Sequence, residues 1–341
     1  MGIFKNAFKK IHSNSFAQKP PWKILFFGTD EFSVYSLKAL YREYINGTVL
    51  KKLEVVTTTK GKANPVRKYA DEHKLLIHSW PVTVPEYVFD VGLVVSFGHL
   101  IPESVISKFP LGMLNVHASL LPRWRGAAPI IYTLANGDTE TGITIMRIRP
   151  KQFDIGEILM QANVLVSSHA KMPELYETLG GLGAKSLISC LEDLQERLAN
   201  AKPQPDEGVT FAPKVSSEFA VVSWEDMTST QIYNRERAVT GLFSLTSSWN
   251  GIPVKLVGVT DCKNCDALLN SKDSVPLKPG FVKYDKKRKT LIVVCADKTL
   301  ISVDKIGIFG KRVMTAMEFN NGYIKKEPVE NRCFKFRRGT T

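Results

Sequence analysis

The first two hundred residues alternate short apolar runs with segments of helical periodicity, and this alternation limits the folds that the chain can adopt. Apolar residues fill neighbouring positions in each run rather than every second position, so strands formed there would be buried on both faces. Strands separated by helices predict a doubly wound α/β domain, with a parallel sheet covered by helices. The runs lie at 23–29, 53–59, 90–97, 112–117 and 142–148.

The sequence NAKPQPDEGVTFAPK, at 200–214, is rich in proline, glycine and polar residues and predicts a linker. Short runs separated by turn residues follow it, which predicts a small β-barrel. A chain of 341 residues is also longer than one hydrophobic core usually supports. We therefore expect one domain at 23–199, the linker, and a second domain at 215–341.

The first 22 residues contain no Asp or Glu, and their apolar residues fall at helical spacing between lysines. An amphipathic basic helix without acids is typical of a mitochondrial presequence. We predict a presequence at 1–22 and a location in the mitochondrial matrix. The alternative is a basic tail without regular structure.

The formal net charge of +13 is concentrated at the two ends of the chain. Residues 209–341 contain 22 Lys and Arg against 13 Asp and Glu, and residues 1–23 contribute five lysines. A basic C-terminal half indicates a polyanionic partner. Charge alone supports an ordinary basic surface equally well.

The chain gives little sign of a membrane or metal partner. No apolar run approaches the roughly 18 residues that a membrane helix needs. Five cysteines at irregular spacing do not predict a secreted disulfide framework. Cys262 and Cys265 have the spacing of half a zinc site, but no second pair completes it. We interpret them as two loop thiols and expect no metal.

Asn115 and His117 stand two residues apart at the end of the predicted strand 112–117. Alternate residues of a strand share a face, and ligands of open α/β sheets bind beyond the carboxyl ends of the strands. Asp154 follows the next predicted strand, 142–148, and we expect it at the same level. The sequence therefore places an amide, an imidazole and a carboxylate around one ligand position.

Such a trio suits acyl transfer to an amine. Asn115 would stabilise negative charge on the carbonyl oxygen, and His117 would polarise that oxygen or move a proton. Asp154 would hold the imidazole. A histidine at a strand end is more often a structural hydrogen-bonding residue, and His99 is a second candidate after the neighbouring strand.

Residues 115–130, NVHASLLPRWRGAAPI, closely resemble the signature of the methionyl-tRNA formyltransferases. ILFFGTDEFSVYSLKAL, VVSFGHLIP, GDTETGITIM and GVTFAPKVS are similar to further segments of this family, so the resemblance covers nearly the whole chain after the presequence. It implies a Rossmann-like doubly wound formyltransferase domain joined to a C-terminal OB-like β-barrel, in an organellar version of the enzyme.

The resemblance implies that a formyl group passes from 10-formyltetrahydrofolate to the α-amine of methionine on initiator tRNA. Asn115, His117 and Asp154 match the catalytic positions of the family, and no metal takes part. Two strand-end loops and the residues after His117 match its folate-binding segments. These candidates are Phe97, Gly98, His99, Leu100, Ile101, Ser119, Leu120, Pro122, Arg149, Pro150, Lys151, Gln152 and Phe153.

A tRNA substrate gives the basic residues a partner, because Lys and Arg neutralise phosphates. For the run at 283–289, a solvated hairpin turn is an equally good interpretation. We expect a monomer with tRNA and folate as its partners and no membrane contact. The candidate tRNA contacts are Lys60, Lys62, Arg123, Arg125, Lys286, Lys287 and Arg288, with Lys283 and Lys289 beside the last three.

Two alternatives remain. Glycinamide ribonucleotide formyltransferases share the core of the signature, and a formyltransferase-like RNA-binding protein without activity would share the fold. The RWRGAAPI segment and the basic C-terminal half favour the tRNA enzyme. Ile155-Gly156-Glu157 replaces the usual bacterial residues after the catalytic aspartate, and the basic loop 59–65 is shorter than the bacterial insertion.

Overall fold

A computed structural model describes residues 19–262 and 278–336. The chain forms two compact units. Unit 1 comprises 19–130, Thr139–Val166 and Glu174–Lys214. Unit 2 comprises Ile131–Asp138, Ser167–Pro173 and 215–336, so two short segments from the first half of the chain belong to it.

Unit 1 is built on one seven-stranded sheet with the strand order β3-β2-β1-β4-β5-β6-β7. The pairs from β3 to β5 are all parallel. From β1 the chain moves outwards to β3 on one side, and it then returns to continue with β4 and β5 on the other side of β1. This change in the progression of the strands is typical of a doubly wound fold and confirms the predicted fold class. The strands are β1 (Trp22–Gly28), β2 (Leu50–Thr57), β3 (Ile77–Ser79), β4 (Val91–Val95), β5 (Met113–His117), β6 (Glu140–Arg147) and β7 (Ile158–Leu165).

The expectation of a wholly parallel sheet is wrong at one edge. β6 pairs antiparallel with β5, and β7 pairs antiparallel with β6. Half-buried and exposed residues alternate from Met160 to Leu165 of β7, as expected for a strand with one covered face. β7 was not among the predicted strands, because it follows a long polar loop.

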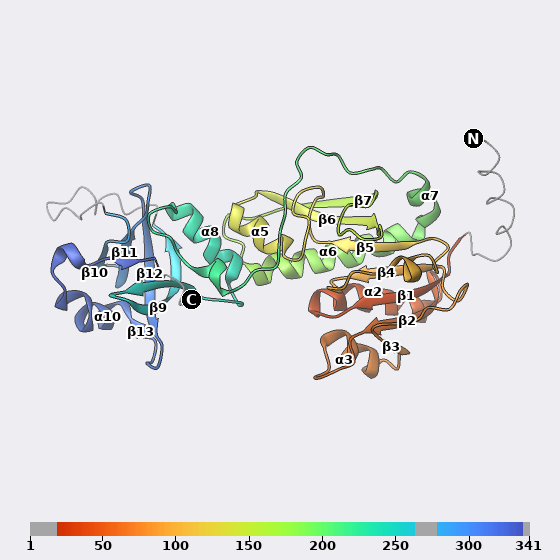
Figure 1. The fold of residues 1–341 in the computed structure, drawn as a ribbon, viewed down its shortest axis with the longest axis horizontal. Coiled ribbons are helices and arrows are strands. Elements are labelled where there is room, and N and C mark those ends of the chain that lie inside the picture. The colour runs from red at the N-terminus through yellow and green to blue at the C-terminus, as the bar shows by residue number, and fades with distance from the viewer. Residues whose placement is uncertain (1–18, 263–277, 337–341) are drawn as a thin grey trace. The chain divides into compact units, whose positions relative to one another are not determined.

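Helices and loops cover both faces of this sheet (Figure 1). On one face, α6 lies against α2 at Gly180, where an added Cβ would be 2.7 Å from the Tyr35 ring. At Gly183 it lies against β5 and β6. Both glycines thus permit close packing of α6 against its neighbours. On the other face, Phe27 of β1 shares a buried cluster with Val105 of α4. The helices are α2 (Glu31–Asn46), α3 (Pro65–Glu72), α4 (Glu103–Ile106), α6 (Met172–Glu192) and α7 (Leu194–Ala199).

α6 ends at Glu192, and a second helix, α7, begins at Leu194. The carbonyl of Leu191 accepts a hydrogen bond of 2.8 Å from the buried Trp22 side chain. The side chain thus supplies a partner for a carbonyl near the helix end, where intrahelical donors run out.

Unit 2 contains a strongly curled antiparallel sheet in the order β10-β11-β12-β9-β8-β14, with β13 paired to β12. β14 pairs with β8, and Cys333, directly before β14, bridges Phe281, directly before β10. The sheet is therefore closed, as a barrel requires. The strands are β8 (Leu245–Trp249), β9 (Ile252–Asp261), β10 (Val282–Asp285), β11 (Thr290–Val294), β12 (Leu300–Ile308), β13 (Met314–Thr315) and β14 (Phe334–Lys335).

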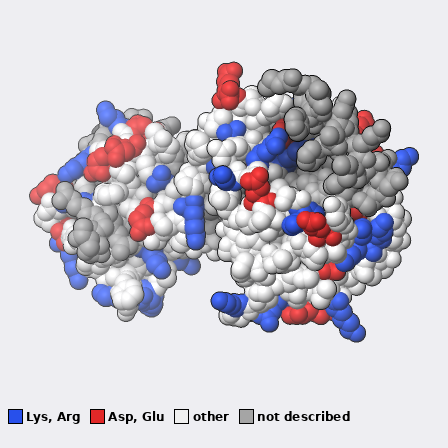
Figure 2. All heavy atoms as spheres, turned by 45° about the vertical axis from the view of Figure 1, so that its right-hand side comes forward, with Lys and Arg blue, Asp and Glu red and all other residues white. Residues whose placement is uncertain are grey.

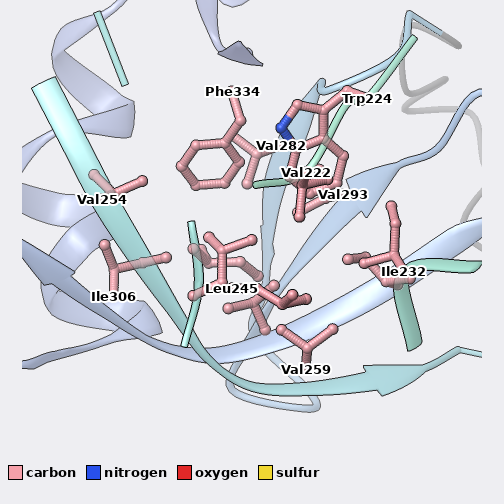
Figure 3. Packing of buried hydrophobic residues seen from close by; sticks show 14 of the residues in the cluster. Val222, Trp224, Ile232, Leu245, Val254, Val259, Val282, Val293, Ile306 and Phe334 are labelled. Carbon is pink, nitrogen blue, oxygen red and sulfur yellow. The ribbon is translucent and has the colours of Figure 1, made fainter. Parts of the chain in front are cut away.

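The barrel encloses an apolar core in which Trp224 stacks on Phe334, with ring centroids 5.9 Å apart (Figure 3). The indole nitrogen of Trp224 donates to the Ser247 hydroxyl, so its one polar atom is satisfied. Three further helices belong to the described residues of unit 2, and two of them have capping boxes. They are α5 (Pro129–Asn136), α8 (Ser229–Val239) and α10 (Ala316–Gly322), with short 3₁₀ turns at Ser217–Ala220, Ile324–Lys326 and Val329–Asn331.

Arg237 of α8 explains why two early segments belong to unit 2. This buried guanidinium donates to the backbone carbonyls of Leu134 and Ala170, which come from those segments. It also donates to the side chain of Asn234. A buried charge needs such a set of partners, and here the partners fix the two segments to α8.

Three other expectations concern the rest of the chain. Cys262 is disulfide-bonded, so the prediction of a loop thiol is wrong at this residue, and Cys265 lies outside the described residues. Most of the predicted presequence also lies outside them. No helix in the described ranges is long and apolar enough to cross a membrane.

Candidate active site

Asp154 lies within contact of both polar residues at the end of β5. Its Oδ1 accepts a hydrogen bond of 3.2 Å from Asn115 Nδ2 and lies 3.6 Å from His117 Nδ1. The side chains of His117 and Asp154 are only 7% and 9% exposed. The three residues expected around one ligand position are therefore together, and solvent screens their charges little.

The proximity of Asp154 was expected for the wrong reason. Because β6 is antiparallel to β5, the carboxyl end of β6 lies beside the start of β5, with Arg147 opposite Leu114. The loop 148–157 begins and ends at this edge, and Asp154 returns within it towards Asn115 and His117. Asp154 itself has a left-handed backbone, with φ of 57°, which Asp tolerates better than most residues.

The second imidazole nitrogen of His117 has a defined partner. Nε2 lies 2.9 Å from the backbone carbonyl oxygen of Trp124. A carbonyl only accepts hydrogen bonds, so Nε2 carries a hydrogen and donates it. Nδ1, which faces Asp154, is then the nitrogen at which the ring gains or loses a proton. Trp124 is buried and has φ of 62°, so its role here is to fix the loop rather than to reach solvent.

The other oxygen of Asp154 is held by the same loop. Oδ2 accepts a hydrogen bond of 2.9 Å from the backbone nitrogen of Gly126. Gly126 has φ of 126°, and an added Cβ would lie 2.6 Å from the Ala212 carbonyl oxygen. Arg125 pairs with the backbone on either side of Phe211, through Thr210 and Ala212. Only glycine fits here, and the segment around Phe211 thereby supports the site.

Gln204 is a residue of this site that the sequence analysis missed. Its amide nitrogen donates to the carbonyl oxygens of Asp154 and Gly156, at 3.0 and 2.9 Å. Its oxygen accepts from Nε and Nη2 of Arg125, at 3.1 and 2.7 Å. It stands in the segment 200–214, interpreted as a linker, which lies within unit 1. No local pattern marks a glutamine whose partners are 50 and 79 residues away.

The predicted folate-binding residues after β4 differ in exposure. Phe97 and Ile101 are buried in a cluster that Ile148, next to Arg149, also contacts. Gly98 has φ of 73°, and the His99 ring lies 5.0 Å from that of Phe97. Leu100 is 46% exposed. The loop after β4 therefore exposes the apolar side chain of Leu100, while the buried Phe97 and Ile101 hold the loop in place.

The remaining folate candidates come from two loops. Ser119 donates to the Arg123 carbonyl oxygen at 2.6 Å, and Leu120 packs over Gly142 of β6. Arg149 pairs with Glu157. Although partial burial opposes it, this Arg149 pair holds the pKa of Glu157 below its usual value. Phe153 is 59% exposed, Lys151 and Gln152 are exposed, and Pro122 and Pro150 are half-buried.

The predicted tRNA contacts fall into three groups. Lys60 and Lys62 are exposed in the loop between β2 and α3. Arg123 lies over the Trp124 ring, 4.3 Å from its centroid, and Arg125 is bound to Gln204. Lys286, Lys287 and Arg288 form the exposed turn between β10 and β11.

The turn between β10 and β11 is fixed by Asp285. Its carboxylate accepts from the backbone nitrogens of Lys287 and Arg288 and from the Arg288 side chain. Partial burial opposes ionisation, but these hydrogen bonds hold the pKa of Asp285 below its usual value. Arg288 is thus paired within the turn, while Lys286 and Lys287 extend outwards. On the face shown in Figure 2, basic and acidic residues are interspersed over both units.

Among the described residues, no cluster of three or more His, Cys, Asp or Glu could hold a metal ion. The site instead combines an amide, an imidazole and a carboxylate with backbone donors and acceptors. It can stabilise charge on a carbonyl oxygen and move a proton, as acyl transfer to an amine requires.

Comparisons with known proteins agree with this chemistry. Residues 81–191 match the family described as formyl transferase, and residues 214–324 match the formyl transferase C-terminal domain. The chain is 44% identical to the human mitochondrial methionyl-tRNA formyltransferase, over 90% of this chain and 79% of the human protein. It is 33% identical to the methionyl-tRNA formyltransferase of Alcanivorax borkumensis, over 89% of this chain and 92% of that protein.

A solved structure shows the same fold. It is an N-formyltransferase from Helicobacter canadensis in complex with folinic acid and dTDP-3-aminofucose. The TM-score is 0.60 at 16% identity, covering 82% of this chain and 98% of that one.

Proposed function

This chain belongs to the methionyl-tRNA formyltransferase family, and we propose that Asn115, His117 and Asp154 are the residues with which it transfers the formyl group. The enzyme formylates the α-amino group of methionine on initiator Met-tRNA, with 10-formyltetrahydrofolate as donor, and supplies fMet-tRNA for translation initiation in mitochondria. The observation that carries the residue assignment is the convergence of Asn115 and His117 on one oxygen of Asp154.

The reaction needs charge stabilisation and a balanced proton transfer. The methionine amine forms a bond to the formyl carbon, the bond from that carbon to the folate nitrogen breaks, and one proton moves from amine to folate nitrogen. Asn115 Nδ2 carries two hydrogens, and one of them makes the hydrogen bond to Asp154 Oδ1. The second is the donor for the formyl oxygen as negative charge develops on it.

His117 is the residue that moves the proton. Its Nε2–H is held by the Trp124 carbonyl, so Nδ1 accepts the proton of the amine and later releases it. Asp154 lies beside Nδ1 and balances the positive charge of the ring. Because Asp154 is itself held by Asn115 and Gly126, the ring keeps one orientation throughout.

The loops beside this site fit a flat, partly apolar donor. Leu100 and Phe153 are large exposed apolar side chains in the two loops that the family resemblance assigns to folate. Exposed apolar groups next to fixed polar ones are typical of ligand sites. We propose that the exposed side chains of these loops contact the rings of the donor, and that the buried Phe97 and Ile101 support them.

The mammalian relatives carry mitochondrial names, and this enzyme is a mitochondrial one by that similarity. We further propose that residues 1–22 direct it to the matrix and that it acts as a monomer. The N-terminus of protein purified from the matrix would give the site of cleavage, and sedimentation would give the mass in solution.

A formylation assay with three variants tests the residue assignment. Met-tRNA is incubated with enzyme and 10-formyltetrahydrofolate, and the product is resolved on an acid gel. Asn115→Ala, His117→Ala and Asp154→Asn should keep wild-type melting temperatures and lose roughly 100-fold to 10,000-fold in kcat. Asn tolerates a left-handed backbone, so Asp154→Asn removes charge without straining φ.

The same assay separates the alternatives. Near-wild-type turnover by His117→Ala would rule out the proposed proton transfer. Formylation of free glycinamide ribonucleotide instead of Met-tRNA would make the chain a purine-pathway enzyme. An RNA-binding protein without activity would retain tRNA and formylate neither.

A further inference from the structure

Gln204 uses both ends of its amide inside the proposed active site. Its oxygen faces two donors of Arg125, and its nitrogen faces the carbonyl oxygens of Asp154 and Gly156. A guanidinium only donates and a carbonyl only accepts, so the partners themselves determine which end of the amide is nitrogen. The side chain connects the loop 119–128 to the loop 148–157.

A primary amide accepts at one end and has two hydrogens to donate at the other, and only glutamine and asparagine carry one. A carboxylate accepts from Arg125 but has no hydrogen to donate to two carbonyls, and an ammonium group donates but cannot accept. Asparagine is one methylene shorter. The site therefore requires an amide at this distance from the backbone.

The backbone that carries Gln204 is fixed on both sides. Lys202, two residues before it, exchanges two backbone hydrogen bonds with Ile158 of β7. Thr210 and Ala212, after it, pair with the backbone of Arg125. A side chain held in this way is a rigid support rather than a mobile one.

What Gln204 supports is the strained residue of the trio. Asp154 stands at φ of 57°, a region that side-chain-bearing residues occupy only when their surroundings hold them there. The Asp154 carbonyl is bound by Gln204, and its carboxylate reaches Asn115, His117 and Gly126. If that carbonyl rotates, the carboxylate moves with the same backbone.

We propose that Gln204 is a positioning residue for formyl transfer, which sets the Asp154 carboxylate against His117 and Asn115 without touching substrate. This inference rests on the proposed function of the trio. It also gives Arg125 a role other than the predicted tRNA contact, because two of its nitrogen atoms orient the Gln204 amide.

The test replaces Gln204 by glutamate, which has the same shape and keeps the Arg125 pair. Gln204→Glu should lose kcat by roughly 100-fold, as expected when a catalytic group is misplaced by about 1 Å, with KM for Met-tRNA and for folate nearly unchanged. The pH profile of kcat should also shift, because the charge and position of groups around His117 change. Gln195, exposed on α7 in the same unit, provides the matched control Gln195→Glu, which should match the wild type.

A second variant, Arg125→Met, keeps the test decisive if Gln204→Glu does not fold. It removes the two donors that orient the amide and should lower kcat more than it raises KM for Met-tRNA. A kcat and pH profile like those of the wild type in whichever variant folds would overturn the proposal, as would a rise in KM alone. His117→Ala is measured in parallel: if it is inactive while Gln204→Glu is fully active, only the positioning role fails.

Discussion

At the scale of single residues, Gly156 shows how closely the loop of Asp154 is packed. A Cβ at this position would lie 1.7 Å from the backbone carbonyl oxygen of Arg147, which cannot rotate away as a side chain would. Gly156→Ala should therefore force apart the backbone pairing of Arg147 and Glu157 and lower the free energy of unfolding by about 3 kcal/mol. Urea unfolding followed by circular dichroism measures the change.

Gly181 of α6 is the control for this substitution, because nothing lies within 4 Å of a Cβ added there. Gly181→Ala should raise the free energy of unfolding by about 0.5–1 kcal/mol, the usual preference of a helix interior for alanine. Equal effects of the two substitutions would contradict the collision at Gly156.

The same scale shows what the sequence could predict of the site. Asn115 and His117 are chemically distinctive side chains at a predictable strand end, whereas the approach of Asp154 depends on the direction of β6 and the path of the loop 148–157. The Trp124 carbonyl and the Gly126 nitrogen are backbone atoms, which every residue has, and their roles depend on φ values of 62° and 126°. Gln204 has an ordinary local context. These contacts depend on the tertiary structure, and no local sequence pattern predicts them.

At the scale of elements, α8 carries a carboxyl group that opposes folding at neutral pH. Burial raises the pKa of Glu236 to about 7, although Lys171 partly opposes this, and its Oε2 has no hydrogen-bond partner among the described residues. Below pH 4.5 the group is protonated in the folded and unfolded chains alike. Between pH 4.5 and about 7 only the unfolded chain releases the proton, so the free energy of unfolding falls as pH rises.

Glu236→Gln should remove this pH dependence. The variant should be more stable than the wild type by about 1–2 kcal/mol at pH 8, a value reduced for partial exposure, and equal to it near pH 4.5. Thermal melts across this pH range measure the difference. Glu225→Gln, at an exposed position of the same unit, should change nothing. A constant difference at all pH values would mean that packing, rather than ionisation, is responsible.

At this scale, the existence of most strands was predictable from the sequence, but the direction of β6 was not. The buried parallel strands and the strands β9 to β12 stand out in the sequence because apolar runs mark them. The direction of β6 cannot be predicted in this way, because an apolar run is the same in a parallel and in an antiparallel strand. Its direction depends on the connection 118–139, which contains α5 and whose path is set by contacts such as the hydrogen bond from Leu121 to Thr144.

At the scale of the whole molecule, the net charge of +13 must be weighed against how it is distributed. Several basic side chains are already paired within the fold, as Arg125, Arg149 and Arg288 are. Acidic residues lie between the others on the face shown in Figure 2. Net charge therefore favours association with tRNA in general, and it cannot identify which residues make contact.

Lys286 and Lys287 offer a direct test of tRNA contact, because Asp285 pairs with Arg288 and leaves these two lysines exposed. Each phosphate neutralised by a lysine releases counterions and contributes about 0.7–0.9 to the slope of log affinity against log salt. The double variant Lys286→Ala and Lys287→Ala should weaken Met-tRNA binding and lower that slope by about 1 to 2, with KM for 10-formyltetrahydrofolate unaltered. Filter binding at several salt concentrations measures the slope. If the slope stays that of the wild type, the turn between β10 and β11 is a solvated hairpin, and the phosphates are bound elsewhere.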